Sequence, residues 1–266
     1  MPMNRKLRIK VFLLNLIRFF SGKKIIVSLT SYPARYEDLH LVVESLLRQK
    51  LKPDRVILYL YEGEAKHLPE TLMRLKSKRF CIVTVGENIR PHKKYFYAFQ
   101  NYPKDLIITV DDDYIYPSDL VMNLYRKHLS HRNAVIGGRC REIKVDEQGK
   151  LLPYNLWPIC YDDSRADMRL VATGVGGVLY TPALLDARVL DLEGIKEFAL
   201  NQDDLWLKTM EILKDTRTVP VTLNWAEGKA LTYDGSLFST NEYGENDACF
   251  QRLLHHYMIS TQMIVQ

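Results

Sequence analysis

Apolar residues in the first half of the chain form short continuous runs, separated by stretches with helical spacing. The continuous runs have the length of β-strands and cover residues 24–29, 56–61, 80–85 and 106–110. After the first run, apolar side chains at positions 39, 42, 43, 46 and 47 predict a helix over residues 37–49, and a weaker helix is expected at 71–76. Strands that alternate with helices and are apolar on both faces predict an α/β fold whose parallel sheet is covered by helices.

The second half of the chain gives weaker signals. Ser118 is placed to cap a helix that ends near residue 130, with Asp119 in its first turn. Residues 134–140 and 174–180 have strand character, and residues 202–213 have the pattern of a helix. The stretch 141–167 is polar and irregular, which predicts an insertion or a mobile loop. Since no linker divides the sequence, we expect a single domain.

The N-terminal segment, residues 1–22, is basic and partly apolar. Its apolar run begins at Val11, but Asn15 and Arg18 interrupt it well before the roughly 20 apolar residues of a membrane span. No small-residue cleavage site follows, which disfavours a secretory signal. The segment fits a basic amphipathic helix on an anionic membrane surface, and it also fits a terminal helix packed on the domain. The spacing of its residues does not separate the two.

Composition and charge narrow the class of protein. The 266 residues are 47% hydrophobic and 26% charged, as in a soluble globular domain, and the net charge of +5 is a mild excess. We expect no nucleic-acid partner. Four widely spaced cysteines predict free thiols in a reducing cytosol, and hence a cytoplasmic protein that lies at the membrane face if residues 1–22 bind lipid. Phosphate-loop, nucleophile-elbow and zincin motifs are missing, which argues against ATPases, hydrolases and zincins.

Three consecutive aspartates, Asp111, Asp112 and Asp113, follow the fourth predicted strand. Ligands of parallel α/β sheets bind beyond the carboxyl ends of the strands. Oxygen-rich clusters suit Mg²⁺ or Mn²⁺, and these ions also bind diphosphate oxygens. A solvated acidic turn that caps the next helix is the alternative. The position after a buried strand and three earlier βα units favours a metal and diphosphate site.

Two further acids, Asp203 and Asp204, open the predicted helix at 202–213. The positive end of a helix favours ionised carboxylates. A general base needs that form in order to remove a proton from an acceptor hydroxyl. Helix capping is the alternative reading, and Asp203 satisfies it alone. We therefore predict Asp204 as the base.

A polar loop from Thr30 to Arg35 follows the first strand, and a basic cluster around Lys94 precedes the fourth. Hydroxyls and an arginine can bind ribose and phosphate, and Tyr32 offers a ring for stacking on a base. Turn chemistry explains the loop at least as well. Lys94 has the charge to neutralise a diphosphate, although charge runs are usually solvated surfaces.

These motifs together resemble the GT-A glycosyltransferases, and in particular the bacterial family-2-like enzymes that build capsule and lipopolysaccharide. The run Thr109 to Asp113, followed by Tyr116-Pro117, resembles their D-x-D region, and Ile26 to Arg35 resembles their first strand and nucleotide loop. Gly176 to Tyr180 and Asp203 to Trp206 are further matches. The resemblance covers about residues 24–213, and the N-terminal segment and 141–167 lie outside it.

The resemblance implies a GT-A, Rossmann-like fold with a mixed, mostly parallel sheet and helices on both faces. It also implies transfer of a sugar from a UDP- or GDP-linked donor to a glycan or lipid-linked acceptor hydroxyl in surface polysaccharide biosynthesis. Within one domain at 23–266, the nucleotide-binding half is expected at about 23–130 and the acceptor half at about 131–266. An inverting mechanism is expected, with a retaining one left open. Sugar nucleotidyltransferases, whose fold is similar, and non-catalytic membrane-associated glycan- or cation-binding proteins are the alternatives.

The resemblance also assigns roles to individual residues. Asp113 becomes the main ligand of Mn²⁺ or Mg²⁺, Asp111 contacts the metal or the ribose, and Asp112 meets the sugar or a neighbouring base. For the loop, the resemblance reverses the preference and favours donor contacts by Thr30, Tyr32 and Arg35. In similar enzymes a lysine also precedes the D-x-D strand by about the interval that separates Lys94 from it. A late histidine often joins the metal, but His255 and His256 fit a helix surface better.

Overall fold

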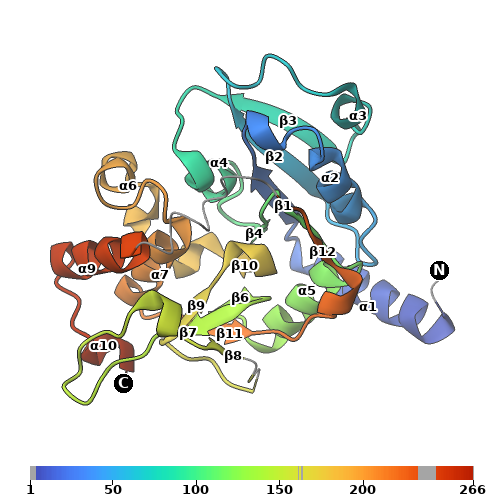
Figure 1. The fold of residues 1–266 in the computed structure, drawn as a ribbon. Helices are drawn as coiled ribbons and strands as arrows, with labels where there is room; N and C mark the ends of the chain where they lie inside the picture. Colours follow the sequence, from blue (N-terminus) through green and yellow to red (C-terminus); the bar gives the residue numbers. More distant parts are fainter. Residues whose placement is uncertain (1–3, 161, 163, 233–243, 266) are drawn as a thin grey trace.

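The computed structural model describes residues 4–160, 162, 164–232 and 244–265. Its centre is a seven-stranded sheet with the strand order β11-β6-β10-β4-β1-β2-β3 (Figure 1). The strands of this sheet are β1 (Ile25–Thr30), β2 (Arg55–Tyr61), β3 (Phe80–Val85), β4 (Leu106–Thr109), β6 (Ala134–Gly137), β10 (Val178–Tyr180) and β11 (Arg217–Pro220). All pairs are parallel except those of β10, which runs antiparallel to both of its neighbours. The predicted mixed, mostly parallel α/β sheet is confirmed.

Helices cover both faces of the sheet, because its central strands are apolar on both sides. In β1, the side chain of Ile26 belongs to one hydrophobic cluster and those of Ile25 and Val27 belong to the other. One cluster contains residues of α4, α7 and α9, and the other contains residues of α1, α2 and α5. The helices are α1 (Arg5–Ser21), α2 (Leu39–Leu47), α3 (Glu70–Met73), α4 (Lys93–Asn101), α5 (Leu120–Ser130), α6 (Leu192–Phe198), α7 (Asp203–Leu213), α9 (Asn246–His256) and α10 (Gln262–Val265).

Two expectations for the second half of the chain are wrong. The predicted strand at 134–140 ends at Gly137, and β7 (Cys140–Glu142) joins β8 (Ile159–Cys160) and β9 (Leu170–Ala172) in a separate three-stranded sheet. Most of the described residues of 141–167 lie outside helices and strands, as expected, although Ile143 and Trp157 are buried. The predicted strand at 174–180 begins with a 3₁₀ turn, η4 (Gly174–Gly176), and only 178–180 is β-strand.

Helix capping also differs from the prediction. Helix α5 begins at Leu120 after Asp119, whose side chain makes no capping hydrogen bond, and the Ser118 hydroxyl instead donates to Glu227. Helix α7 begins at Asp203 after Gln202 and has no side-chain cap. The alternative reading, in which Asp203 caps this helix, is therefore wrong, and both of the paired acids are available for other contacts.

The N-terminal segment forms α1, which ends at Gly22 in a left-handed conformation (φ 67°). Only Val11 and Leu14 are buried along this helix, and it extends from the edge of the domain (Figure 1). Among the described residues, none of the helices has the length and hydropathy needed to cross a membrane. The predicted helix is confirmed.

His128, in α5, gives the fold a dependence on pH. Burial, aided by Lys23 and Arg132, lowers the pKa of His128 to about 4, whereas an unfolded chain has a pKa of about 6.5. Because the unfolded chain takes up the proton first, the stabilisation is complete above pH ~6.5 and is lost as the pH falls towards ~4.

We expect His128→Phe to reduce the loss of stability between about pH 7.5 and about pH 5 by roughly 2 kcal/mol. The phenyl ring retains the stacking on Tyr125 and cannot take up a proton. Urea denaturation of both proteins at the two pH values measures the difference. An equal acid loss in the variant would show that His128 is not the group responsible.

Candidate active site

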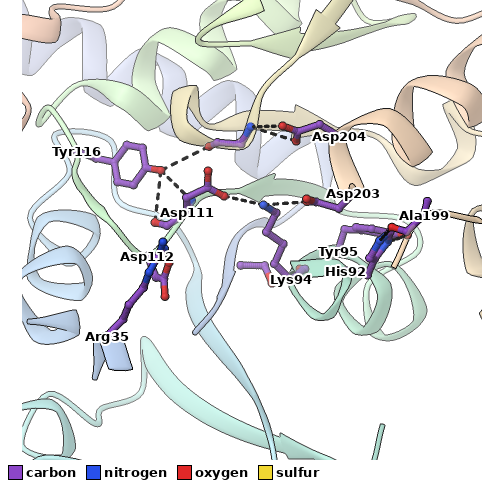
Figure 2. Close-up of polar contacts among 12 residues, drawn as sticks. Arg35, His92, Lys94, Tyr95, Asp111, Asp112, Tyr116, Ala199, Asp203 and Asp204 are labelled. Atoms are coloured by element: carbon purple, nitrogen blue, oxygen red, sulfur yellow. Dashed lines mark hydrogen bonds and ion pairs between the residues drawn. The ribbon is translucent and has the colours of Figure 1, made fainter. Parts of the chain in front are cut away.

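Acidic side chains gather where β4 ends and α7 begins (Figure 2). Asp111 follows β4 after a single residue, Val110, which is fully buried and anchors the strand end. The start of α4 and the turn η4 lie against the same point, because Lys94 and Gly174 both contact Asp111. Residues more than 60 positions apart in sequence therefore meet at the carboxyl edge of the parallel strands, where α/β folds bind ligands.

Lys94 joins two of the acids. Its Nζ lies 2.6 Å from Asp111 Oδ1 and 2.9 Å from Asp203 Oδ2, and its side chain is only 5% exposed (Figure 2). Burial disfavours the ammonium, but the carboxylates around it, first Asp111 and then Asp203, raise the pKa of Lys94 well above its usual value. Lys94 therefore stays protonated. Its two ion pairs connect the D-D-D segment, Asp111 to Asp113, with the start of α7.

Arg35 forms ion pairs with the other two aspartates of the triple. Its guanidinium forms an ion pair with Asp112 and lies 3.0 Å from Asp113 Oδ2. Asp112 is 6% exposed, so its carboxylate faces the arginine rather than solvent. The side chain of Asp113 is 30% exposed, and burial followed by the charge of Asp111 raises its pKa to about 6. Asp113 is therefore the more accessible of the two aspartates. The contact with Arg35 does not fully offset the repulsion between the carboxylates of Asp113 and Asp111.

Asp204 lies on the opposite side of the cluster from Arg35. Both of its carboxylate oxygens accept from the backbone N–H of Gly174, at 3.2 and 3.3 Å (Figure 2). Burial, and then the charge of Asp203, raise the pKa of Asp204 well above its usual value. Burial and the charge of Asp203 therefore oppose the effect of the helix dipole, which favours the ionised acid. A raised pKa makes the carboxylate a stronger base toward a hydroxyl.

Several contacts that hold the acids in place were not predicted from sequence. The buried hydroxyl of Tyr116 accepts from the Asp111 backbone N–H at 2.8 Å, and the Ser28 hydroxyl of β1 donates to the Lys94 carbonyl. His92 bonds Tyr95 through Nδ1 (2.8 Å) and the Ala199 carbonyl through Nε2 (2.7 Å). Burial lowers the pKa of His92 to about 4, so the ring is neutral and links the start of α4 to the segment before α7. Tyr116-Pro117 and His92-Lys93-Lys94 were visible motifs, but their contacts depend on tertiary structure.

In the loop after β1, Thr30 contacts the sheet, whereas Tyr32 and Arg35 lie at the acidic site. The Thr30 hydroxyl donates to the Tyr59 carbonyl of β2 at 2.8 Å, so it supports the sheet. The Tyr32 ring lies 5.2 Å from the guanidinium carbon of Arg35, which places both residues beside the D-D-D segment. His255 and His256 are exposed on α9.

Asp111 and Asp113 fit a divalent cation in one particular way. Across the described ranges, no cluster of three or more His, Cys, Asp or Glu side chains could hold a metal ion unaided. The carboxylates of Asp111 and Asp113 repel each other, and the pKa of Asp113 is raised as a result of burial and this repulsion. Such a pair is suited to a cation that takes its remaining ligands from phosphate oxygens and water. The residues present therefore fit a cation that binds together with a phosphorylated ligand.

Gly174 is the position where this site tolerates no side chain. A Cβ there would lie 2.5 Å from Asp111 Oδ1 and 2.8 Å from Lys94 Nζ. We expect Gly174→Ala to push this ion pair apart and to lower turnover by about 100-fold or more, because misplacement of about 1 Å is enough for such losses. Steady-state kinetics measure the effect, with Gly86→Ala, at an exposed position where a Cβ meets nothing closer than 4.0 Å, as the control. Wild-type turnover in Gly174→Ala would show that the pair is not needed.

A sheet of this order with acids at the end of β4 is typical of the GT-A class of glycosyltransferases. The sequence model of glycosyl transferase family 2 matches residues 26–188, more than half of the chain. The chain belongs to this family and is an enzyme of the transferase class. The matched residues include the loop after β1, Lys94, the three aspartates and Gly174.

Solved structures share the fold at low sequence identity. The mannosyltransferase PcManGT from Pyrobaculum calidifontis, in complex with GDP-Man and Mn²⁺, matches with a TM-score of 0.55 and 11% identity over 94% of this chain and 74% of its own. Glucosyl-3-phosphoglycerate synthase from Mycobacterium tuberculosis, with Mn²⁺, UDP and phosphoglyceric acid, gives 0.55 and 14% over 92% and 81%. The 4-diphosphocytidyl-2C-methyl-D-erythritol synthase from Anaerococcus prevotii gives 0.52 and 13% over 84% and 96%.

No curated protein sequence is significantly similar to this chain. Because the solved relatives are less than 15% identical and include a cytidylyl-type synthase beside glycosyltransferases, their likeness establishes the fold and not the reaction. The family match, which is made on the sequence, is what separates a glycosyltransferase from the nucleotidyltransferase alternative.

Proposed function

We propose that this glycosyltransferase uses a nucleoside-diphosphate sugar and a divalent cation, and transfers the sugar to a hydroxyl of a glycan or lipid-linked acceptor. One observation carries the proposal: in a family 2 chain, Asp111, Asp113 and Asp204 converge on one edge of the sheet, around Lys94 and Gly174. PcManGT with GDP-Man and Mn²⁺, and the mycobacterial synthase with UDP and Mn²⁺, support a donor of this kind.

On the donor side, Asp113 and Asp111 hold Mn²⁺ or Mg²⁺ together with the diphosphate. When bound, the cation stabilises the negative charge that the leaving diphosphate gains. Arg35 keeps Asp113 oriented through its 3.0 Å contact, and Lys94 keeps Asp111 oriented from the other side at 2.6 Å. Asp112 has a positioning role in this scheme, because its carboxylate pairs with Arg35.

The nucleoside binds beside the loop after β1. A hollow of about 520 Å³ lies between this loop and the segment after β2, and Pro33, Tyr36, Glu64 and His67 are among its lining residues. It is large enough for a nucleoside. Tyr32 contacts the base or the ribose from the loop itself, where its ring already lies against Arg35.

On the acceptor side, Asp204 is the general base and Asp203 positions Lys94. The carboxylate of Asp204 removes the proton of the acceptor hydroxyl as this oxygen attacks the anomeric carbon and the bond to the diphosphate breaks. A single displacement of this kind inverts the anomeric configuration. Residues from about 23 to 130 then bind the donor, residues from about 131 to 266 bind the acceptor, and surface polysaccharide is the product class.

The experiment measures release of nucleoside diphosphate from a panel of UDP- and GDP-sugars, and release of pyrophosphate from nucleoside triphosphates mixed with sugar phosphates. Each reaction is run with Mn²⁺, with Mg²⁺ and with a chelator. We expect turnover only with a divalent cation, and loss of turnover in Asp113→Asn. Asp162→Asn, a change of the same kind at an exposed position, serves as the control. Full activity of Asp113→Asn would refute the metal assignment, and turnover confined to nucleoside triphosphates with release of pyrophosphate would identify a nucleotidyltransferase instead.

A further inference from the structure

We propose that helix α1 lies in the interface of an anionic phospholipid membrane and attaches the enzyme to it. This goes beyond sugar transfer, since it concerns a surface that the candidate active site does not use. The sequence alone left two partners open for this helix, the membrane and the domain. The structure shows that the domain covers only one side of it.

The uncovered side of α1 is apolar. Seven of the twelve large hydrophobic side chains that are exposed in the described part of the chain lie on this one helix. Phe19 and Phe20 are 78% and 77% exposed, and Phe12 is 64% exposed. At 100° per residue, Ile9, Leu16 and Phe20 lie on the side opposite the buried Val11 and Leu14. The helix therefore directs its larger apolar face away from the protein.

The positive charge of residues 1–24 favours an anionic membrane as the partner of α1. Residues 1–24 contain seven of the 37 Lys and Arg and none of the 32 Asp and Glu, so residues 25–266 carry a net charge of −2. The exposed side chains of Lys6, Arg8 and Lys24 lie on or beside the helix. A basic helix with an exposed aromatic and aliphatic face is the arrangement that binds at the headgroup level of anionic membranes. A second copy would instead bring two strongly basic helices together, which Coulomb repulsion disfavours.

A hollow along α1 fits the same partner. It has a volume of about 610 Å³; Phe12, Leu16 and Phe19 supply its large apolar side chains, and its polar lining includes Asn15, Arg18, Lys23 and Asp54. Arg18 already neutralises Asp54 at 3.5 Å and donates to the Lys52 carbonyl at 2.8 Å. Large apolar side chains beside a lysine match the acyl chain and the phosphate of a phospholipid.

Membrane attachment leaves the acids at a distance from the helix. Strand β1 begins directly after α1 and runs for six residues, about 20 Å, to the edge where Asp111 lies. Membrane binding and turnover of a soluble donor are therefore separable, and failure of one does not imply failure of the other.

The test is sedimentation of the full-length protein with phosphatidylcholine vesicles, with and without phosphatidylglycerol. We expect binding only when phosphatidylglycerol is present, and weaker binding as salt is added. The variant Phe12→Ser/Phe19→Ser/Phe20→Ser should bind at least about tenfold more weakly, because burial of these rings is lost. Its release of nucleoside diphosphate from a sugar nucleotide in solution should stay at the wild-type rate.

A matched triple variant controls for the number of apolar side chains. Met73→Ser/Leu156→Ser/Met258→Ser removes three exposed residues that lie elsewhere, and it should bind like the wild type. Substitution is preferred to deletion of the helix because Val11 and Leu14 pack on the domain. Wild-type binding by the phenylalanine variant would overturn the proposal. So would a dimer in light scattering that this variant abolishes, with no binding to vesicles, since α1 would then join two copies of the chain.

Discussion

Asp204→Asn lowers the rate of sugar transfer by a factor of about 10² to 10⁴ and leaves the affinity for the donor close to that of the wild type. The amide retains the shape of the side chain and can no longer accept a proton from the attacking hydroxyl. Asp111 and Asp113, to which the donor contacts are assigned, pair with Lys94 and Arg35, whereas Asp204 accepts from the Gly174 backbone. A fall in kcat with little change in donor affinity is therefore the expected signature.

The matched control for this variant is Glu193→Gln. Glu193 is also an acid in the first turn of a helix, α6, but its side chain is 82% exposed and lies outside the acid cluster. We expect this variant to turn over normally. If Asp204→Asn also transferred sugar at the wild-type rate, the base would have to be another residue.

Lys94→Met lowers the free energy of unfolding by about 3–5 kcal/mol when no metal is present. The change removes a cation that is 5% exposed and leaves Asp203, at 10%, without its ion-pair partner. Asp111 loses the same partner, although its 29% exposure lets water replace part of the interaction. Urea denaturation of wild type and variant in the presence of a chelator measures the difference.

The second variant needed is Lys94→Met/Asp203→Asn. Removal of the buried charge along with its partner should recover part of the lost stability, because an uncompensated carboxylate is the main cost of the single change. Lys50→Met, whose ion pair with Asp119 spans 3.9 Å at a more exposed position, should cost less than about 1 kcal/mol. If Lys94→Met were as stable as the wild type, water rather than Lys94 would be the main partner of the Asp111 and Asp203 carboxylates.

The sheet and the three aspartates could be predicted because the signals for both are local. A parallel sheet that is covered on both faces forces its strands to be continuously apolar, and the runs that became β1 to β4 are of this kind. An acid directly after such a strand must lie at the sheet edge, so Asp111 needed no tertiary information. The start of α7 was found for the same reason, as paired acids before an amphipathic pattern.

The rest of the site depends on contacts that sequence spacing does not encode. Gly174 matters because Asp111 and Lys94 fill the space where its Cβ would be, and that proximity arises from η4 folding against β4. The polarity of residues 141–167 predicted their mostly irregular backbone, but it did not predict that Trp157 is buried in the core. Periodicity also could not tell which face of α1 is buried, since both faces are apolar.

The central claim is that Asp111 and Asp113 form a joint site for a divalent cation and a nucleoside diphosphate. The most direct measurement is calorimetric titration of UDP and GDP into the protein, with Mn²⁺ and with a chelator, for wild type and Asp113→Asn. We predict that Mn²⁺ strengthens the binding of one of the two nucleotides at least about tenfold, which is about 1.4 kcal/mol, in the wild type only. Equal affinity with and without Mn²⁺ in the wild type would contradict the claim.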